Sequence, residues 1–251
     1  MEHINQNHPL TIASQQKISK HHFEGVNFTD LKKEGVVFEG CIFEEVNFAS
    51  SQFKELEAYN CQFLGCRFTH AQFNEALFDS CIFYDDKKDQ GTDFSYAQMK
   101  FSKFLNCDLS QAKFKQANLC GIQIKNCKAL AADFEYAQFA NQVSAKVSIA
   151  QAEITESVLR FSRFVRVNLA GCDLSSNDFS EADFAYSNLS EANLTHCLLD
   201  NASFTHGSLE SAELQESSII NLDLKDCTLK NLKLSPDQCI EFLRLFEIEV
   251  V

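Results

Sequence analysis

A large apolar side chain recurs at every fifth residue from Phe23 to Leu234. In the first part of the chain, only Lys33 and Ala58 break this pattern. A period of five matches neither the 3.6-residue period of an α-helix nor the two-residue period of a flat strand. The chain must therefore turn a corner at each repeat, which predicts a coil. The phenylalanines of this first run are Phe23, Phe28, Phe38, Phe43, Phe48, Phe53, Phe63, Phe68, Phe73, Phe78 and Phe83.

The pattern resumes at Phe94, one residue out of phase, and afterwards only Ala129 and Ser144 are too small or too polar for it. A smaller side chain lies two residues before each large one, as in residues 182–184 (ADF). We call the large residue of each pentad the central position and the smaller one the small position. An internal repeat of this length takes precedence over the domain count that chain length alone suggests.

These pentads resemble those of the pentapeptide-repeat family, whose fold is a right-handed quadrilateral β-helix with four pentads per turn. The resemblance implies that the central and small positions point inward and that the other three positions face solvent. The sequence agrees, because those three are mostly Ser, Thr, Asn, Gln, Lys, Asp and Glu. We therefore expect an all-β protein with a parallel β-helix over residues 21–234. A polar segment or cap at 1–20 precedes it, and a C-terminal helix and tail at 235–251 follow.

The charge of the chain limits its partners. Lys and Arg number 22 and Asp and Glu 35, which leaves a net charge of −13. Such a chain is repelled by nucleic-acid phosphates and by anionic membranes, and it is attracted to basic surfaces. No apolar run approaches the ~20 residues of a membrane span, and the opening segment does not resemble a signal peptide. We expect a cytoplasmic protein that binds neither nucleic acid directly nor membranes.

Nine of the eleven cysteines occupy small positions. An unpaired cysteine behaves as a small apolar residue, so the main interpretation is a set of buried thiols. The alternative comes from a spacing of twenty residues, which recurs among five of them and would stack neighbours within disulfide reach if one coil took twenty residues. The nine cysteines are Cys41, Cys61, Cys66, Cys81, Cys107, Cys127, Cys172, Cys197 and Cys227.

The first interruption of the repeat lies between Phe83 and Phe94, where eleven residues stand in place of the expected ten. Continuing the coil through this charged segment would bury Lys88, so we predict a loop at about 84–93, called loop A. Loops on rigid scaffolds often carry function. We expect loop A to contact a partner, with Tyr84 as an apolar anchor. Its candidate contact residues are Tyr84, Asp85, Asp86, Lys87, Lys88, Asp89 and Gln90.

The second interruption keeps the phase but loses the apolar character of the inward positions. Gln142 and Ser144 would both be buried there, which would cost a few kcal/mol without hydrogen-bond partners. We predict a second loop at about 140–151, called loop B, with polar partner contacts. Its candidate contact residues are Asn141, Gln142, Val143, Ser144 and Lys146.

The C-terminus carries a helix start. Ser235 is the expected N-cap, Pro236 takes the first helical position and Gln238 completes a capping box. The apolar residues that follow are too many for a short solvated helix. They either close the last coil or form a two-fold dimer contact, and we favour the dimer. The residues concerned are Ile240, Phe242, Leu243, Leu245 and Phe246.

The two loops and the C-terminal segment resemble those of the Qnr family, pentapeptide-repeat proteins that protect bacterial DNA gyrase from quinolones. The similar stretches are FYDDKKDQGTDFS (83–95), GIQIKNC (121–127), NQVSAK (141–146) and LSPDQCIEFLRLFEIEVV (234–251). The resemblance covers roughly residues 61–251, and residues 1–45 extend beyond the start typical of the family. It implies binding to DNA gyrase or topoisomerase IV and tail-to-tail homodimerisation through the C-terminal helix.

Three classes of function compete. A topoisomerase-binding protein explains the acidic rod and the two loops, whereas a generic protein-interaction scaffold gives no reason to interrupt the coils twice. An enzyme has little support, because the chain lacks the GxxxxGK[ST], HExxH and GxSxG motifs. His196, which is next to Cys197, and His206 lie ten residues apart. In a square coil this spacing puts the two histidines on opposite faces, which argues against a metal site. We expect no catalytic residue, cofactor or metal.

Overall fold

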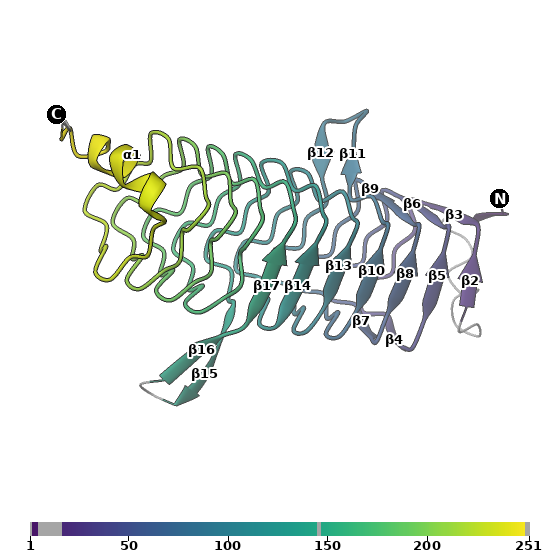
Figure 1. The fold of residues 1–251 in the computed structure, drawn as a ribbon. Helices are drawn as coiled ribbons and strands as arrows, with labels where there is room; N and C mark the ends of the chain where they lie inside the picture. The colour runs from purple at the N-terminus through teal and green to yellow at the C-terminus, as the bar shows by residue number, and fades with distance from the viewer. Residues whose placement is uncertain (1, 5–16, 145–146, 249–251) are drawn as a thin grey trace.

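A computed structural model describes residues 2–4, 17–144 and 147–248. The chain forms a rod of stacked coils, a right-handed quadrilateral parallel β-helix (Figure 1). The coil predicted from the five-residue period and the quadrilateral β-helix implied by the family resemblance are both confirmed. No helix within the described residues has the length and apolar character needed to cross a membrane.

Short parallel strands of successive coils pair along the rod. One sheet has the order β17-β14-β13-β10-β8-β5-β2, a second has the order β1-β3-β6-β9, and β4 pairs with β7. Beyond β17 the ladder continues as isolated bridges, such as the one between Asp183 and Ser203. The parallel strands are β1 (Glu2–Ile4), β2 (Lys17–Ser19), β3 (His21–Glu24), β4 (Lys32–Glu34), β5 (Val37–Glu39), β6 (Ile42–Glu44), β7 (Gln52–Lys54), β8 (Glu57–Tyr59), β9 (Gln62–Leu64), β10 (Leu77–Asp79), β13 (Lys103–Leu105), β14 (Ile122–Lys125) and β17 (Ala152–Thr155).

The ladder begins earlier than residue 21, where the sequence places the start of the β-helix. Strand β2 pairs with β5, with Lys17 opposite Val37. Strand β1 pairs with β3, with Glu2 opposite His21. Ile18, five residues before Phe23, is buried and lies opposite Phe38, so the apolar period extends one pentad further towards the N-terminus than the predicted start.

The central positions form columns of stacked phenylalanine rings inside the rod. The Phe43 and Phe63 rings lie parallel, with their centroids 4.7 Å apart and their planes 2° from each other. This distance is the spacing of neighbouring strands, because each ring sits directly over its equivalent in the next coil. Almost all central residues are buried, which confirms that these positions point inward.

Both interruptions are antiparallel hairpins inserted between normal coils. Asn47 pairs with Arg67, a step of 20 residues, but Arg67 pairs with Asp93, a step of 26 (67 to 93). Loop A therefore inserts six residues into a single pentad, and the interpretation of eleven residues in place of ten was wrong. Its hairpin pairs β11 (Tyr84–Asp85) with β12 (Gln90–Gly91).

Loop B inserts ten residues, because Lys128 pairs with Val158, a step of 30 (128 to 158). Its hairpin pairs β15 (Ala140–Ser144) with β16 (Val147–Ala150). The two hairpins project from opposite sides of the rod, at different positions along its axis (Figure 1). An insertion of ten equals two pentads, which explains why the sequence pattern keeps its phase across loop B.

The small-position cysteines are buried thiols without disulfides, apart from Cys227, which is half-buried. The backbone N–H of Cys41 donates to Sγ of Cys61 at 3.4 Å, and that of Cys107 donates to Sγ of Cys127 at 3.3 Å. Residues 20 apart are thus neighbours in adjacent coils, as the alternative interpretation required, but no disulfide forms between them. Burial raises the pKa of the Cys197 thiol to about 12.

A short helix closes the C-terminal end of the rod. It begins as a 3-10 turn, η2 (Pro236–Gln238), and continues as α1 (Cys239–Arg244). The backbone N–H of Ser235 donates to Oε1 of Gln238 at 2.7 Å, as expected for the reciprocal half of a capping box. The Gln238 amide also donates to the carbonyls of Leu214 and Ser217 at 2.8 and 2.7 Å, so it satisfies the open end of the ladder.

Candidate partner-binding site

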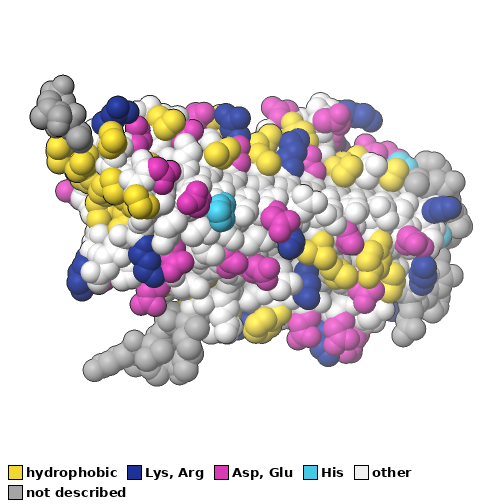
Figure 2. Space-filling model, viewed as in Figure 1, with side chains coloured by type: hydrophobic (Ala, Val, Ile, Leu, Met, Phe, Trp, Pro, Cys, Tyr) yellow, Lys and Arg dark blue, Asp and Glu magenta, His cyan; other side chains and the backbone are white. Residues whose placement is uncertain are grey.

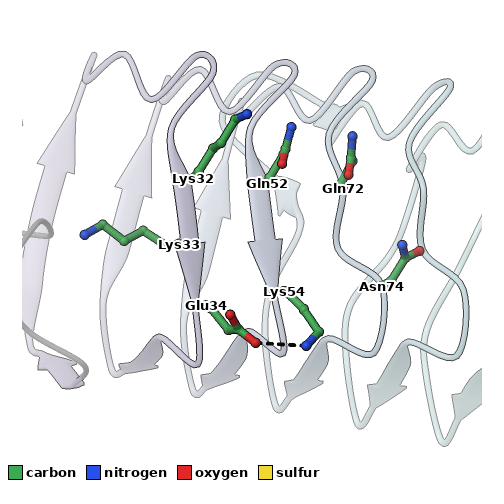
Figure 3. Close-up of a pocket in the computed structure, with 7 residues that line it drawn as sticks. All are labelled: Lys32, Lys33, Glu34, Gln52, Lys54, Gln72 and Asn74. Carbon is green, nitrogen blue, oxygen red and sulfur yellow. Dashed lines mark hydrogen bonds and ion pairs between the residues drawn. The ribbon is translucent and has the colours of Figure 1, made fainter.

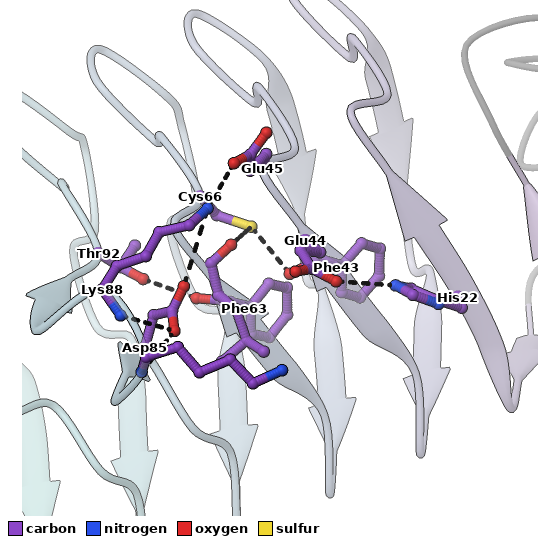
Figure 4. Close-up of polar contacts among 11 residues, drawn as sticks. His22, Phe43, Glu44, Glu45, Phe63, Cys66, Asp85, Lys88 and Thr92 are labelled. Carbon is purple, nitrogen blue, oxygen red and sulfur yellow. Dashed lines mark hydrogen bonds and ion pairs between the residues drawn. The ribbon is translucent and has the colours of Figure 1, made fainter.

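Loop A is tied to the coil beneath it through Asp85 and Lys88. The Asp85 carboxylate is buried and accepts hydrogen bonds from the backbone N–H groups of Lys87 and Lys88 at 3.1 and 3.4 Å. The Lys88 ammonium reaches across to the carboxylate of Glu45, two coils away, and lies 4.0 Å from Asp85 (Figure 4). These contacts hold the base of the loop against the rod.

The other side of loop A is held by Asp89. Its carboxylate accepts a hydrogen bond from the Tyr84 hydroxyl at 2.7 Å and one from the Gln111 amide at 2.6 Å. The hydrogen bond from the Tyr84 hydroxyl is the main reason that the pKa of Asp89 lies below its usual range. The same hydrogen bond raises the pKa of Tyr84. The Lys128 ammonium lies over the Tyr84 ring, 5.9 Å from its centroid. Tyr84, predicted as an anchor for a partner, is thus engaged within the chain itself.

Gly91 and Thr92 return the chain from the hairpin to the coil. A Cβ atom on Gly91 would lie 2.2 Å from the backbone carbon of Gln111, so only glycine fits this approach. The Thr92 hydroxyl donates to the carbonyls of Phe63 and Phe83, at 2.9 Å to each. Ser102, another residue at a small position, makes the equivalent bond to the carbonyl of Phe73 at 2.6 Å, so the coil is regular again directly after the hairpin. Nothing in the spacing pattern singled out these two residues as the seat of the loop.

Three further predicted residues of loop A face solvent. Asp86 and Lys87 lie in the turn of the hairpin, and Gln90 lies in β12 opposite Asp85. Lys88 and Asp89 are exposed as well, although both have internal contacts. The turn of the hairpin is therefore the part of loop A that projects furthest towards a partner.

Loop B leaves the rod as a two-stranded hairpin with a bulge between Gln142 and Ser144. Asn141 is half-buried at its base, where its side-chain oxygen accepts a hydrogen bond from the Lys100 ammonium at 3.3 Å. The structure describes Gln142, Val143 and Ser144 as backbone of β15, and the predicted contact Lys146 lies outside the described residues. The sequence pattern did not point to Lys100 as a support for this loop.

The C-terminal helix divides its predicted dimer residues into two groups. Phe242 and Leu245 pack against the core of the last coils, as the capping alternative requires. Ile240 and Phe246 are 52% and 46% exposed, and Leu243 is half-buried. Hydrophobic side chains gather at this end of the rod (Figure 2). The helix thus closes the coil with one face and leaves apolar side chains on the other.

A shallow hollow lies on a different face, near β4 and β7. It has a volume of about 440 Å³ and carries three lysines, of which Lys54 is paired with Glu34 at 2.8 Å. In Figure 3 these two side chains meet at one end of the hollow, and Lys33 points away from them. No group of three or more His, Cys, Asp or Glu side chains among the described residues could hold a metal ion. The lining residues are Lys32, Lys33, Glu34, Gln52, Lys54, Gln72 and Asn74.

His196 and His206 are both exposed, as expected for residues that directly precede an inward position. The His206 ring stacks on Tyr186 with centroids 4.9 Å apart, and its Nδ1 lies 3.4 Å from the Asp226 carboxylate. Neighbouring Cys197 is buried in the core. The three side chains are therefore not brought together.

Comparison with known proteins agrees with this architecture. Residues 162–237 match the model of the pentapeptide repeat region, and residues 92–128 and 102–141 match that of pentapeptide repeats. The pentapeptide repeat protein QnrB4 of Escherichia coli is 38% identical over 97 residues, which are 39% of this chain and 45% of that protein. QnrB96 of Scandinavium goeteborgense, a quinolone resistance pentapeptide repeat protein, is 37% identical over 97 residues. These matches span less than half the length of the curated relatives.

Solved structures extend the likeness to most of the rod. A trypsin-treated variant of QnrB1, a plasmid-mediated fluoroquinolone resistance protein, superposes with a TM-score of 0.64 and 25% identity over 93% of this chain and 100% of that chain. Full-length QnrB1 superposes with a TM-score of 0.60 and 27% sequence identity, over 92% of this chain and 98% of that chain. Part of residues 1–45 belongs to the same ladder as the rest of the rod, because β2 pairs with β5 and β3 pairs with β6. On these grounds, the chain belongs to the pentapeptide-repeat proteins and, among them, to the Qnr family.

Proposed function

We propose that this protein binds bacterial type II topoisomerase, with DNA gyrase as its first target and topoisomerase IV as a second, and protects the enzyme from quinolones. The support is the likeness to QnrB1 and QnrB96, whose names describe quinolone or fluoroquinolone resistance. It acts by binding, and no catalytic step is needed. Bound to the topoisomerase, the rod destabilises the drug-bound cleavage complex, so that the enzyme reseals its DNA.

The acidity of the rod supports a basic docking surface. Many cations are matched by a carboxylate in the neighbouring coil, as in Lys128 with Asp108 at 3.2 Å and Lys230 with Glu210 at 2.8 Å. Such exposed pairs add little stability but cancel local positive charge. The excess of 35 acidic over 22 basic residues therefore acts at long range, and it steers the rod to the positively charged surface on which an enzyme binds DNA.

The observation that carries the proposal is the pair of hairpins inserted into an unbroken core. Phe68 stacks on Phe94 across the coil of loop A, with centroids 5.0 Å apart, and Phe134 stacks on Phe164 across the coil of loop B, at 4.5 Å. The hairpins thus contribute nothing that the core requires. Two projections on opposite sides of a rigid rod suit recognition of a partner.

The same proposal includes a homodimer through the C-terminal end. The inward residues of the last coil are only half-buried, because no further coil covers them and α1 covers just part of the end. These residues are Leu224, Cys227, Leu229, Leu232 and Leu234. Together with exposed Ile240 and Phe246, they form an apolar end face. A second copy related by a two-fold axis would bury this face.

The test is a gyrase supercoiling assay in the presence of a fluoroquinolone, with the protein titrated from far below to far above the enzyme concentration. Two variants exploit the repeat. Excision of residues 85–90 joins Tyr84 to Gly91, and excision of residues 141–150 joins Ala140 to Gln151. Each deletion restores the 20-residue step, so both variants are expected to keep the rod. Circular dichroism and thermal melting check that they do.

We expect the intact protein to restore supercoiling at low concentration and each excised variant to lose most of this effect while remaining folded. If both excised variants protect as well as the intact protein, the loops are not the recognition elements. If the intact protein neither restores supercoiling nor binds gyrase, the protein is an interaction scaffold without a topoisomerase role.

A further inference from the structure

One corner of the rod carries a column of planar side chains. Its members lie two residues after a central phenylalanine, at positions whose φ angles are positive, such as 63° at Tyr96. The backbone N–H of Tyr96 donates to the carbonyl of Lys115 at 2.9 Å, and that of Gln116 donates to Glu135 at 3.2 Å, so successive members lie in successive coils. The column consists of His70, Tyr96, Gln116, Tyr136, Arg166, Tyr186 and His206.

In the C-terminal half of this column, an arginine fills the space between two tyrosines. The Arg166 guanidinium lies between two tyrosine rings, 5.6 Å from the centroid of Tyr136 and 4.7 Å from that of Tyr186. Tyr186 stacks on His206 on its other side. A guanidinium between two aromatic faces combines stacking with cation–π attraction.

The N-terminal half repeats the same arrangement without the arginine. Tyr96 stacks on His70 with centroids 4.8 Å apart and planes 10° from each other. Between Tyr96 and Tyr136 the column holds Gln116, at the place equivalent to Arg166. The two tyrosines are 44% and 47% exposed. A hollow of about 590 Å³ opens here, lined by His70, Tyr96, Gln98, Gln116, Tyr136 and Gln138.

The charges beside this hollow balance one another. The Lys115 ammonium is held by the carboxylates of Asp133 and Glu135 at 3.2 and 3.1 Å, and Arg163 reaches the same two carboxylates at 3.4 and 3.5 Å. Two cations and two anions leave no local positive charge to repel an incoming cation. At longer range the net charge of −13 attracts one.

We propose that the hollow between Tyr96 and Tyr136 is a binding site for an arginine side chain of a basic protein partner. The guanidinium enters beside Gln116 and lies between its two tyrosine rings as Arg166 does two coils further along the rod. Its N–H groups donate to the side-chain oxygens of Gln98 and Gln138, which line the same hollow. A lysine ammonium lacks the planar fork that stacks between two rings, so the site prefers arginine.

This site lies on the rod itself and goes beyond the proposed function, because its recognition chemistry does not depend on which basic protein is bound. Tyrosine and arginine are also the residues most often found at the energetic centres of protein interfaces.

The test compares two fluorescein-labelled nonapeptides that differ only in carrying three arginines or three lysines separated by glycines. Fluorescence anisotropy measures their affinity for the full-length protein. We expect the arginine peptide to bind about fivefold more tightly, in line with cation–π attraction at an exposed site. The key variant is Gln116→Arg, whose own guanidinium should fill the hollow as Arg166 fills its equivalent. The matched control is Asn201→Arg, which makes the same charge change at an exposed position on a different corner.

We expect Gln116→Arg to reduce the affinity for the arginine peptide to that of the lysine peptide, and Asn201→Arg to preserve the preference. Tyr96→Leu, which removes one ring at an exposed position, should also abolish the preference. Equal binding of the two peptides to the intact protein would overturn the proposal, as would equal effects of the two arginine substitutions or the absence of any binding.

Discussion

At the scale of single residues, the rod depends on phenylalanine at the central positions. The Phe63 ring stacks on Phe43 on one side and on Phe83 on the other, with centroids 4.7 and 4.9 Å apart. A flat ring suits this place, because its thickness lets identical side chains lie over one another at the strand spacing. Each contact is weak, but a buried side chain makes several dozen of them, so the column contributes substantially to stability.

We predict that Phe63→Ala will lower the free energy of unfolding by about 3–5 kcal/mol, because it leaves a cavity between two rings that cannot close up. Urea unfolding followed by circular dichroism measures the change. Phe161→Ala is the control, since Phe161 lies at a corner and is 48% exposed. Similar losses for the two variants would show that the column does not behave as a close-packed core.

The thiols offer a second prediction at this scale. Cys239 is the exposed cysteine of the eleven, whereas burial raises the pKa of Cys172 to about 11 and that of Cys197 to about 12. The thiolate is the reactive form, so the folded protein at pH 8 should show one thiol that reacts rapidly with Ellman's reagent. Cys239→Ser should remove this fast phase, and Cys197→Ser should leave it unchanged. Several thiols reacting at one rate would contradict the buried arrangement.

At the scale of elements, the two hairpins are attached in different ways. Loop A is seated by side chains, among them Asp85, Lys88 and Asp89, which bond to the loop or to neighbouring coils. Loop B continues as a longer antiparallel ladder and is supported at its base by Lys100 through Asn141. The position of loop A should therefore respond to pH, because carboxylates hold it.

We predict that the Asp89 carboxyl titrates below its ordinary value of 3.8 in the folded protein. A carboxyl whose pKa is lowered on folding stabilises the fold above its unfolded pKa and loses this contribution as the pH falls through its folded pKa. Loop A should thus loosen below about pH 3.8, the ordinary value. Carbon-detected NMR titration of the Asp89 carboxyl measures this pKa directly.

Tyr84→Phe should raise the Asp89 pKa towards 3.8, because it removes the hydroxyl that donates to the carboxylate. The control is Tyr59→Phe, which removes a hydroxyl bonded to Glu57 at 2.9 Å on another face. An Asp89 pKa that is the same in the intact protein and in Tyr84→Phe would mean that this hydrogen bond does not hold the loop.

At the scale of the whole molecule, the C-terminal end of the rod is incompletely covered. The Gln238 amide caps the carbonyls of Leu214 and Ser217, but the inward side chains of the last coil remain half-buried. Ile248 beyond the helix is 48% exposed as well. An exposed apolar surface of this kind often marks an interaction site.

We predict that the protein sediments at twice its chain mass of 28.4 kDa and that Ile240→Asp together with Phe246→Asp reduces it to the mass of one chain. A buried, unpaired carboxylate at an apolar contact is strongly unfavourable, so the dimer should dissociate. Val158→Asp, at a position 39% exposed on the side of the rod, is the control and should not change the mass. A monomeric intact protein across the micromolar range would refute the dimer.

Much of this molecule follows from the amino-acid sequence alone. The five-residue period determines the coil, the inward positions and the buried cysteines, because each pentad repeats the same choice between core and solvent. The two interruptions could be located because Lys88, Gln142 and Ser144 are incompatible with a core. The helix start at Ser235 and Pro236 is a local signal and was equally readable.

The tertiary structure decided which residues become neighbours between coils. Residues 20, 26 or 30 apart along the chain are in contact only after the coils stack, and the loop lengths set which of these steps applies. Loop A thereby brings Tyr96 onto His70, and loop B brings Arg166 onto Tyr136, two contacts that the regular 20-residue step does not show. The internal contacts of Tyr84 could not be read from the sequence for the same reason, since Asp89 lies across the hairpin and Lys128 lies in a later coil. A period reports which way a side chain points, whereas its contacts depend on how the coils are stacked.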